Sequence, residues 1–162
     1  MYHTQEKRNV PLGKAIICVK DDAWLGEGYY FWYDEQDANF WGLKFKRRTG
    51  YFNIYKVNVL SDNMLDTVFN EEHYLFWVKQ IEKAAKNFVI KTGTKPSLKE
   101  INDYFKDKGF WVRFDGILFQ DISSNPEHYI VKEFQYKKRI QLVVYNYDII
   151  SNFAVYYEGK CV

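Results

Sequence analysis

The chain has 162 residues, which favours a single domain, 1–162, long enough to bury a core of its own. Hydrophobic residues make up 47% and charged residues 27%, a globular composition that argues against disorder, collagen-like repeats and coiled coils. The net charge of +2, from 23 basic and 21 acidic residues, is too small to make a polyanion the expected partner.

Aromatic residues make up 20% of the chain, so we expect a core built largely of packed rings. Residues 14–19 (KAIICV) are apolar and β-branched, which predicts a short buried strand. The loop Asp22–Gly28 then leads into the aromatic run Tyr29–Tyr33. From Asp34 the apolar residues follow a helical period, with acidic residues first and basic residues last, the order that the helix dipole favours. The residues expected to face inward are Ala38, Trp41, Leu43 and Phe45.

The middle of the chain predicts a strand and then a long helix. Residues 51–59 (YFNIYKVNV) alternate between apolar and polar, which is typical of a strand with one face in water. The residues expected on that polar face are Asn53, Lys56 and Asn58. Residues 71–88 keep the spacing of a single buried helical stripe, and Asn70 suits the N-cap position. The stripe comprises Tyr74, Trp77, Val78, Ile81, Ala84, Ala85 and Phe88.

The last third predicts a second helix and several strands. Ser97 and Glu100 form a capping box that begins a helix ending near Lys108, before Gly109. The residues expected inside are Leu98, Ile101, Tyr104 and Phe105. Strand-like segments follow at 110–119, 128–134, 139–146 and 149–157. Strands at both ends with helices between them predict an α+β fold.

Several function classes lack their sequence signals. No G-x-G-x-x-G follows a strand into a helix, and no G-x-x-x-x-G-K-[ST] occurs, which argues against Rossmann and P-loop nucleotide sites. Cys18 and Cys161 lie far apart, outside any zinc-binding spacing, so we expect no disulfide framework and no metal. The polar start and the lack of a long apolar run predict a cytoplasmic protein that does not associate with membranes.

Three short motifs follow one another in the first quarter of the chain. His3-Thr4 stands in a strand-like start, Gly-x-Gly-x-Tyr-Phe spans Gly26–Phe31, and Ala38–Phe40 (ANF) falls in the predicted helix. Their order and spacing resemble the ADP-ribosyltransferase catalytic domain, especially the poly(ADP-ribose) polymerase-like branch with its His-Tyr-Glu signature. Segments similar to those of small bacterial and phage-encoded members occur at 55–59, 63–66, 114–117, 143–146 and 149–150. The resemblance implies an ADP-ribosyltransferase-like split β-sheet core with two to three helices.

The resemblance also implies an enzyme that uses NAD as its substrate. Such an enzyme transfers ADP-ribose to a macromolecular acceptor, a protein or a nucleic acid. Small members are often toxins of toxin–antitoxin or phage-defence systems, so an antitoxin protein is an implied partner. Breaking the nicotinamide–ribose bond passes through an oxocarbenium-like centre, which requires positioning and electrostatic stabilisation.

The family pattern assigns roles to individual residues here. Tyr30 would stack on the nicotinamide, and His3 would hydrogen-bond the ribose on the adenosine side. Gly26 and Gly28 would let the backbone approach the ligand closely. The residues that would contact NAD are His3, Thr4, Gly26, Gly28, Tyr30, Phe31, Ala38 and Phe40, and the catalytic set is His3, Tyr30, Gln141 and Glu133.

Two positions depart from the family pattern. Thr4 replaces the usual glycine after the histidine, so the carboxamide clamp would be built differently. Gln141 stands where the catalytic glutamate is expected, and a glutamine carries no negative charge to oppose the oxocarbenium centre. Activity would then be weak, confined to a reactive acceptor, or supported by another acid such as Glu133.

Two other functions remain open on the sequence alone. A catalytically weak or inactive module could keep the cleft as a recognition surface. A nucleic-acid-binding domain could use exposed aromatic rings with the basic clusters 44–48 and 137–139. Both clusters are more typical of a solvent-exposed face, and if both line the same rim they could attract the NAD pyrophosphate or a nucleic-acid acceptor.

Overall fold

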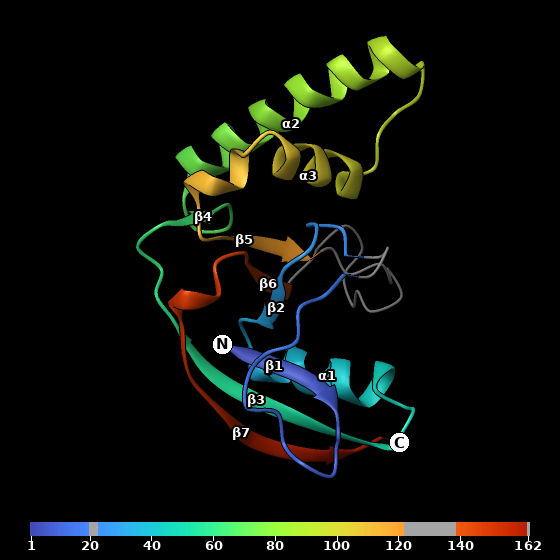
Figure 1. Ribbon diagram of the computed structural model, residues 1–162, viewed down its shortest axis with the longest axis vertical. Helices are drawn as coiled ribbons and strands as arrows, with labels where there is room; N and C mark the ends of the chain where they lie inside the picture. Colours follow the sequence, from blue (N-terminus) through green and yellow to red (C-terminus); the bar gives the residue numbers. More distant parts are fainter. Residues whose placement is uncertain (20–22, 122–138, 162) are drawn as a thin grey trace, which may run out of the picture.

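The computed structural model describes residues 1–19, 23–121 and 139–161. Within these ranges a seven-stranded mixed β-sheet is accompanied by three α-helices, which confirms the predicted α+β class (Figure 1). The strands are β1 (Tyr2–Glu6), β2 (Tyr29–Trp32), β3 (Tyr51–Val59), β4 (Met64–Asp66), β5 (Gly116–Asp121), β6 (Arg139–Val144) and β7 (Ile150–Lys160). The helices are α1 (Glu35–Phe45), α2 (Glu71–Thr92) and α3 (Leu98–Asp107), with 3-10 helices at Phe110–Arg113 and Tyr147–Ile149.

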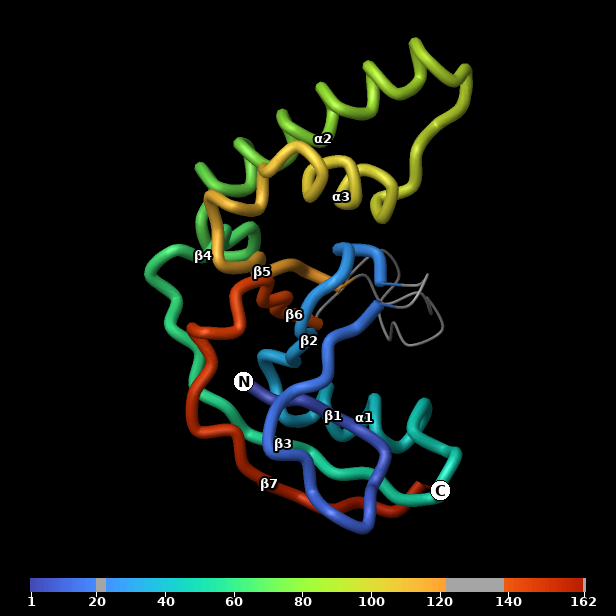
Figure 2. The backbone as a smooth tube through the Cα atoms, viewed as in Figure 1, coloured from blue at the N-terminus to red at the C-terminus, as the bar shows by residue number. Residues whose placement is uncertain are grey.

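The sheet brings strands from both ends of the chain together in the order β4-β5-β6-β2-β1-β3-β7. Only β4 and β5 run parallel, and the other neighbouring strands pair antiparallel. Figure 2 shows β3 and β7 at one end of the molecule and the helices α2 and α3 at the other. The N-terminal strand β1 therefore lies inside the sheet, between β2 and β3.

The sheet opens between β2 and β1. These strands share a single register pair, Tyr2 with Trp32, whereas β1 pairs with β3 over five residues and β2 pairs with β6 over four. Beyond that pair the His3 imidazole, rather than the backbone, hydrogen-bonds the Tyr30 carbonyl. The central pairing is therefore replaced by a gap that side chains can line.

All three α-helices cover one face of the sheet. Tyr30 and Trp32 lie two positions apart on β2, so they point to the same face. Tyr30 packs with the apolar cluster under α2 and α3, and Trp32 packs with the cluster under α1. Phe31, Leu142 and Val144 belong to a third cluster on the opposite face. The helices thus stand on the two sides of the gap, above the two halves of the sheet (Figure 1).

The predicted helix starts are confirmed. The Asn70 side chain accepts a hydrogen bond from the His73 backbone at 3.1 Å, and α2 ends at Gly93, whose φ of 72° is left-handed. The capping box of α3 is complete, because Ser97 Oγ accepts from the Glu100 amide and the Glu100 carboxylate accepts from the Ser97 amide at 2.7 Å. Local side-chain chemistry alone thus locates these helix starts.

Some residues predicted to be inside the helical stripes are exposed. Phe45 is 58% exposed, Tyr74 50% and Tyr104 43%. Trp77 and Ala84 are the buried residues of α2, because this long helix contacts the rest of the protein along only part of its stripe. The prediction that Phe45, Tyr74 and Tyr104 are core residues is therefore wrong.

The predicted strand at 14–19 is also wrong. Cys18 makes an isolated bridge with Gly28, and Ile17 and Val19 are exposed. That bridge lies just before β2, and the segment pairs with none of the seven strands of the sheet. The segment instead runs as an irregular connection that packs Ala15 into the core.

The later strand predictions hold in part. Asn53 is fully buried rather than exposed. The strand β3 lies between β1 and β7, and the burial of Phe52–Tyr55 shows that both faces of β3 are covered there.

The bounds of the later strands differ from the prediction at one place. Residues 110–113 form a 3-10 helix, so the strand predicted from 110 begins only at Gly116. The predictions for 139–146 and 149–157 correspond to β6 and β7, and the strand predicted at 128–134 lies outside the described residues.

Candidate functional site at the gap between β2 and β1

A cavity of about 460 Å³ lies at the gap in the sheet. Of the site residues predicted from the sequence, His3, Thr4, Tyr30, Phe31 and Gln141 line this cavity. They come from β1, β2 and β6, three segments far apart in the sequence. His3 and Phe31 belong to one face of the sheet, and Tyr30 and Gln141 to the other, so the cavity reaches both faces through the gap. Its volume falls in the usual range of small-molecule sites.

His3 is held as a neutral imidazole by contacts on both ring nitrogens. Nδ1 lies 2.8 Å from the Tyr30 carbonyl, which can only accept, so Nδ1 carries the proton. Nε2 then accepts from the Gln5 amide nitrogen at 3.2 Å and from the Ile16 backbone at 3.5 Å. Burial lowers the His3 pKa from 6.5 to about 4, the Tyr30 carbonyl opposes that shift, and the positive charge of Lys46 lowers the pKa further.

Tyr30 ties the cavity wall to the loop before β2. Its hydroxyl donates to the Gly26 carbonyl at 2.7 Å, and its ring packs against the cluster under α2 and α3. The ring is half-buried, so it presents part of its surface to the cavity. This placement fixes the ring before any ligand arrives.

Gln141 places an unpaired polar atom in the cavity wall. The residue is 9% exposed, and its Oε1 is buried with no hydrogen-bond partner among the described residues. An unpaired buried amide oxygen costs about 1–3 kcal/mol of stability. Gln141 is therefore available to a ligand.

The other end of the cavity is cationic. Arg8, Lys46 and Arg48 line it, and among the described lining residues Glu6 is the acidic one, so these four side chains together carry a charge of +2. Glu6 is occupied by the α1–β3 turn, because its carboxylate accepts from the Arg48 and Thr49 amides at 3.1 Å. An anionic ligand would therefore be attracted to this end.

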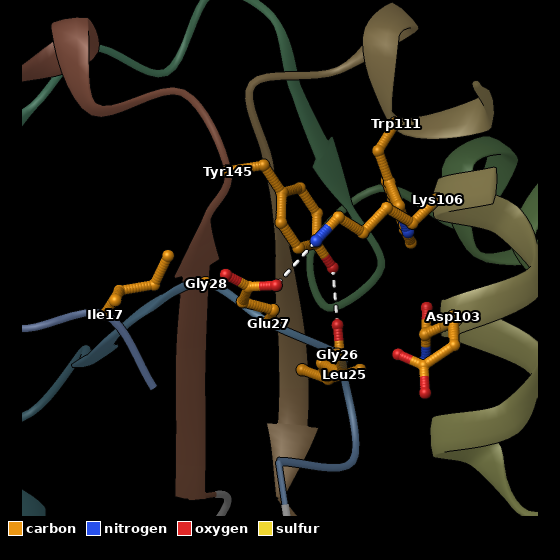
Figure 3. A pocket seen from close by; sticks show the side chains of 10 residues that line it. Ile17, Leu25, Gly26, Glu27, Gly28, Asp103, Lys106, Trp111 and Tyr145 are labelled. Atoms are coloured by element: carbon orange, nitrogen blue, oxygen red, sulfur yellow. Dashed lines mark hydrogen bonds and ion pairs between the residues drawn. The ribbon is translucent and has the colours of Figure 1, made fainter. Parts of the chain in front are cut away.

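Gly26 and Gly28 do not line this cavity, contrary to the expected ligand contact. They line a separate cavity of about 140 Å³ between the loop, α3 and Tyr145, where Glu27 and Lys106 form an ion pair at 2.6 Å (Figure 3). Gly26 has a left-handed φ of 82°, and a Cβ at Gly28 would lie 2.5 Å from Val143. Turn geometry and close packing explain these glycines.

The remaining predicted residues have other surroundings. Ala38 is fully buried in α1, where its carbonyl accepts from the Thr4 hydroxyl at 2.9 Å. Phe40 is exposed on the same helix, and the Arg139 guanidinium lies 5.7 Å from its ring centre. Neither lines the large cavity, so the structure does not bring Ala38 and Phe40 together with the other predicted site residues. Glu133 lies outside the described residues.

Sequence reasoning missed most of the residues that complete the cavity wall. These are Gln5, Ile16, Cys18, Trp24, Trp41 and Arg8. The basic cluster 44–48 did contain a signal, because Lys46 and Arg48 line the cavity. No spacing rule predicts the other residues, because several of them lie in the irregular segment before β2.

The chemistry offered by the cavity is that of uncharged hydrogen-bonding groups at one end and cations at the other. No set of three or more His, Cys, Asp or Glu side chains able to hold a metal ion occurs in the part of the chain that the structure describes. Within the same ranges, none of the helices combines the length and the apolar character needed to cross a bilayer.

Comparison with known proteins identifies no relative of this chain. No protein-family model, no curated protein and no solved structure matches it.

Proposed function

We propose that the chain is an ADP-ribosyltransferase that binds NAD in the cavity between β2 and β1. The observation that carries this proposal is the placement of Gln141, whose buried amide oxygen has no hydrogen-bond partner among the described residues, in one cavity with His3 and Tyr30. The family resemblance named these three positions from distant segments. The cationic end of the same cavity suits the pyrophosphate of a dinucleotide.

The neutral His3 defines how a ribose would bind. Nδ1–H is committed to the Tyr30 carbonyl, so only Nε2 is available, and it can only accept. A ribose hydroxyl would donate to Nε2 and replace the Gln5 amide, which now lies 3.2 Å away. This exchange keeps His3 uncharged and leaves Gln5 free to bond the sugar as well.

In the proposed reaction the glycosidic C–N bond of NAD breaks, and neutral nicotinamide leaves with the bonding electron pair. An acceptor nucleophile then bonds to C1′ and loses a proton. Tyr30 would hold the leaving ring, and the Gln141 amide would bond a ribose hydroxyl. Because that amide carries no charge, it stabilises the oxocarbenium-like centre less than a carboxylate would.

Gln141→Leu should change stability and NAD affinity in opposite directions. Leucine has a similar volume and removes the unpaired amide, so we expect the free energy of unfolding to stay the same or rise by about 1–2 kcal/mol. Loss of the ligand hydrogen bond should weaken NAD binding about 5- to 10-fold. Urea unfolding and calorimetric titration with NAD measure the two effects.

Gln80→Leu on α2, outside the cavity, is the matched control, and it should leave NAD binding unchanged. A Gln141→Leu protein that is folded and binds NAD as well as the parent would contradict the proposed role of this amide.

A binding module without turnover is the second candidate. The observation in its favour is that both nitrogens of His3 are already satisfied and residue 141 is not an acid. This candidate predicts NAD binding without release of nicotinamide.

A further inference from the structure

Three aromatic rings form a ladder along one wall of the large cavity. Trp32 is buried in the sheet, and its ring centre lies 5.6 Å from that of Trp41. Trp41 in turn stacks on Phe45, one helical turn later on α1, with ring centres 4.1 Å apart and planes at 30°. The ladder therefore runs from the buried wall to the open end.

Phe45 at the end of the ladder is exposed to solvent. The residue is 58% exposed although a stacking partner covers one side of its ring. A bare aromatic face beside a cavity loses contact with water when a planar group stacks on it. Base stacking on an aromatic side chain is favourable for any base, because every base has a π-face.

The cations surround this aromatic shelf, which we define as Trp41 and Phe45. Lys46 follows Phe45 directly, Arg48 lies two residues further, and Arg8 follows β1 on the neighbouring wall. His3 and Glu6 lie three residues apart on β1, so about 10 Å of strand separates the part of the cavity at His3 from the part at Glu6 and the cations. Among the described lining residues the three cations outnumber the one carboxylate, which suits the negative charge of a pyrophosphate diester.

We propose that the open end of the cavity is a nucleoside-diphosphate subsite. The base stacks on the aromatic shelf, and the pyrophosphate lies between Arg8 and Arg48. The assignment rests on the proposed function, because the subsite would hold the adenosine diphosphate half of NAD. The groups that the subsite would contact, a base and a pyrophosphate, occur in any purine nucleoside diphosphate. The subsite can therefore be tested without the reaction.

ADP is the direct probe of this subsite. Phe45→Ala should weaken ADP binding about ten-fold in calorimetric titrations, because the base loses its stacking partner. Phe69→Ala is the matched control, since Phe69 is 61% exposed and lies outside the cavity, and it should bind ADP as the parent does. Arg8→Gln with Arg48→Gln should also weaken binding and make it less dependent on salt, whereas Arg113→Gln should do neither.

The outcomes separate the subsite from the proposed function. No ADP binding at millimolar concentration, or equal binding by the parent and Phe45→Ala, overturns the subsite even where NAD still binds through Gln141. ADP binding that depends on Phe45, in a protein that releases no nicotinamide from NAD, supports the subsite and counts against the transferase.

A single-stranded nucleic acid could offer the same base and phosphate chemistry. A short oligodeoxyadenylate is therefore titrated in parallel. Displacement of the oligonucleotide by ADP supports the subsite, and an oligonucleotide that binds more tightly than ADP through Phe45 overturns its assignment to a free nucleoside diphosphate.

Discussion

Gln141→Glu should raise the rate of nicotinamide release from NAD by about 10²- to 10³-fold. The carboxylate would supply, beside the developing oxocarbenium centre, the negative charge that the glutamine lacks, and one well-aimed electrostatic partner contributes about that factor. Glutamate and glutamine have nearly the same size, so the substitution changes charge rather than packing. Release of nicotinamide in single-turnover and steady-state assays measures the effect.

The environment of residue 141 adds a pH dependence to this result. The position is 9% exposed, and burial raises the pKa of a carboxyl group placed there. The rate of the Gln141→Glu protein should therefore increase with pH as the new carboxyl ionises. Gln80→Glu on α2 is the matched control and should leave the rate unchanged. A folded Gln141→Glu protein that binds NAD without faster turnover would place residue 141 away from the reaction centre.

Protonation of His3 should destabilise the protein by about 3 kcal/mol in acid. The imidazole has a pKa of about 4 in the folded protein and 6.5 as the unperturbed value, so the unfolded chain binds the proton more tightly. The contribution of His3 is therefore complete above about pH 6.5 and is lost as the pH falls towards 4. The free energy of unfolding in urea should decrease across this range.

Other groups titrate in acid as well, so the effect of His3 is obtained by difference. His73→Gln should retain the decrease between pH 6.5 and 4, and His3→Gln should lose most of it. NMR titration of the His3 ring protons tests the same point in the parent protein, without a substitution. A native His3 pKa near 6.5 would contradict the assignment of Nε2 as a buried acceptor.

The helices were predictable because their signals are local. Asn70 and the Ser97–Glu100 capping box act on amides within one turn, and both cap the helices as expected. The alternation at 51–59 likewise predicted β3, although the burial of Asn53 depends on strands from elsewhere in the chain. The alternation of apolar and polar residues predicts that a segment is a strand, but it does not predict whether one or both faces of the strand are buried.

The site was predictable only in part because its walls come from long-range pairing. His3, Tyr30 and Gln141 line one cavity as the family resemblance suggested, but their separation along the chain gives no physical rule for that. Gly26 and Gly28 were assigned to the ligand, whereas Val143 and the turn account for them. A glycine motif indicates close approach of the backbone without naming what approaches.

The exposed ring of Phe45 illustrates the opposite error. Helical period placed it in the core, but α1 ends there and the ring continues the stack of Trp41 along the cavity. An apolar residue at the last turn of a helix can therefore contribute to a site rather than to packing. Whether such a residue packs in the core or lines a cavity depends on the strands around it.

Calorimetric titration of the purified protein with NAD at neutral pH tests the central claim most directly. The cavity between β2 and β1 should bind one NAD per chain, with a dissociation constant between about 1 μM and 1 mM. Absence of binding at millimolar NAD, by protein freed of any partner, would contradict the account.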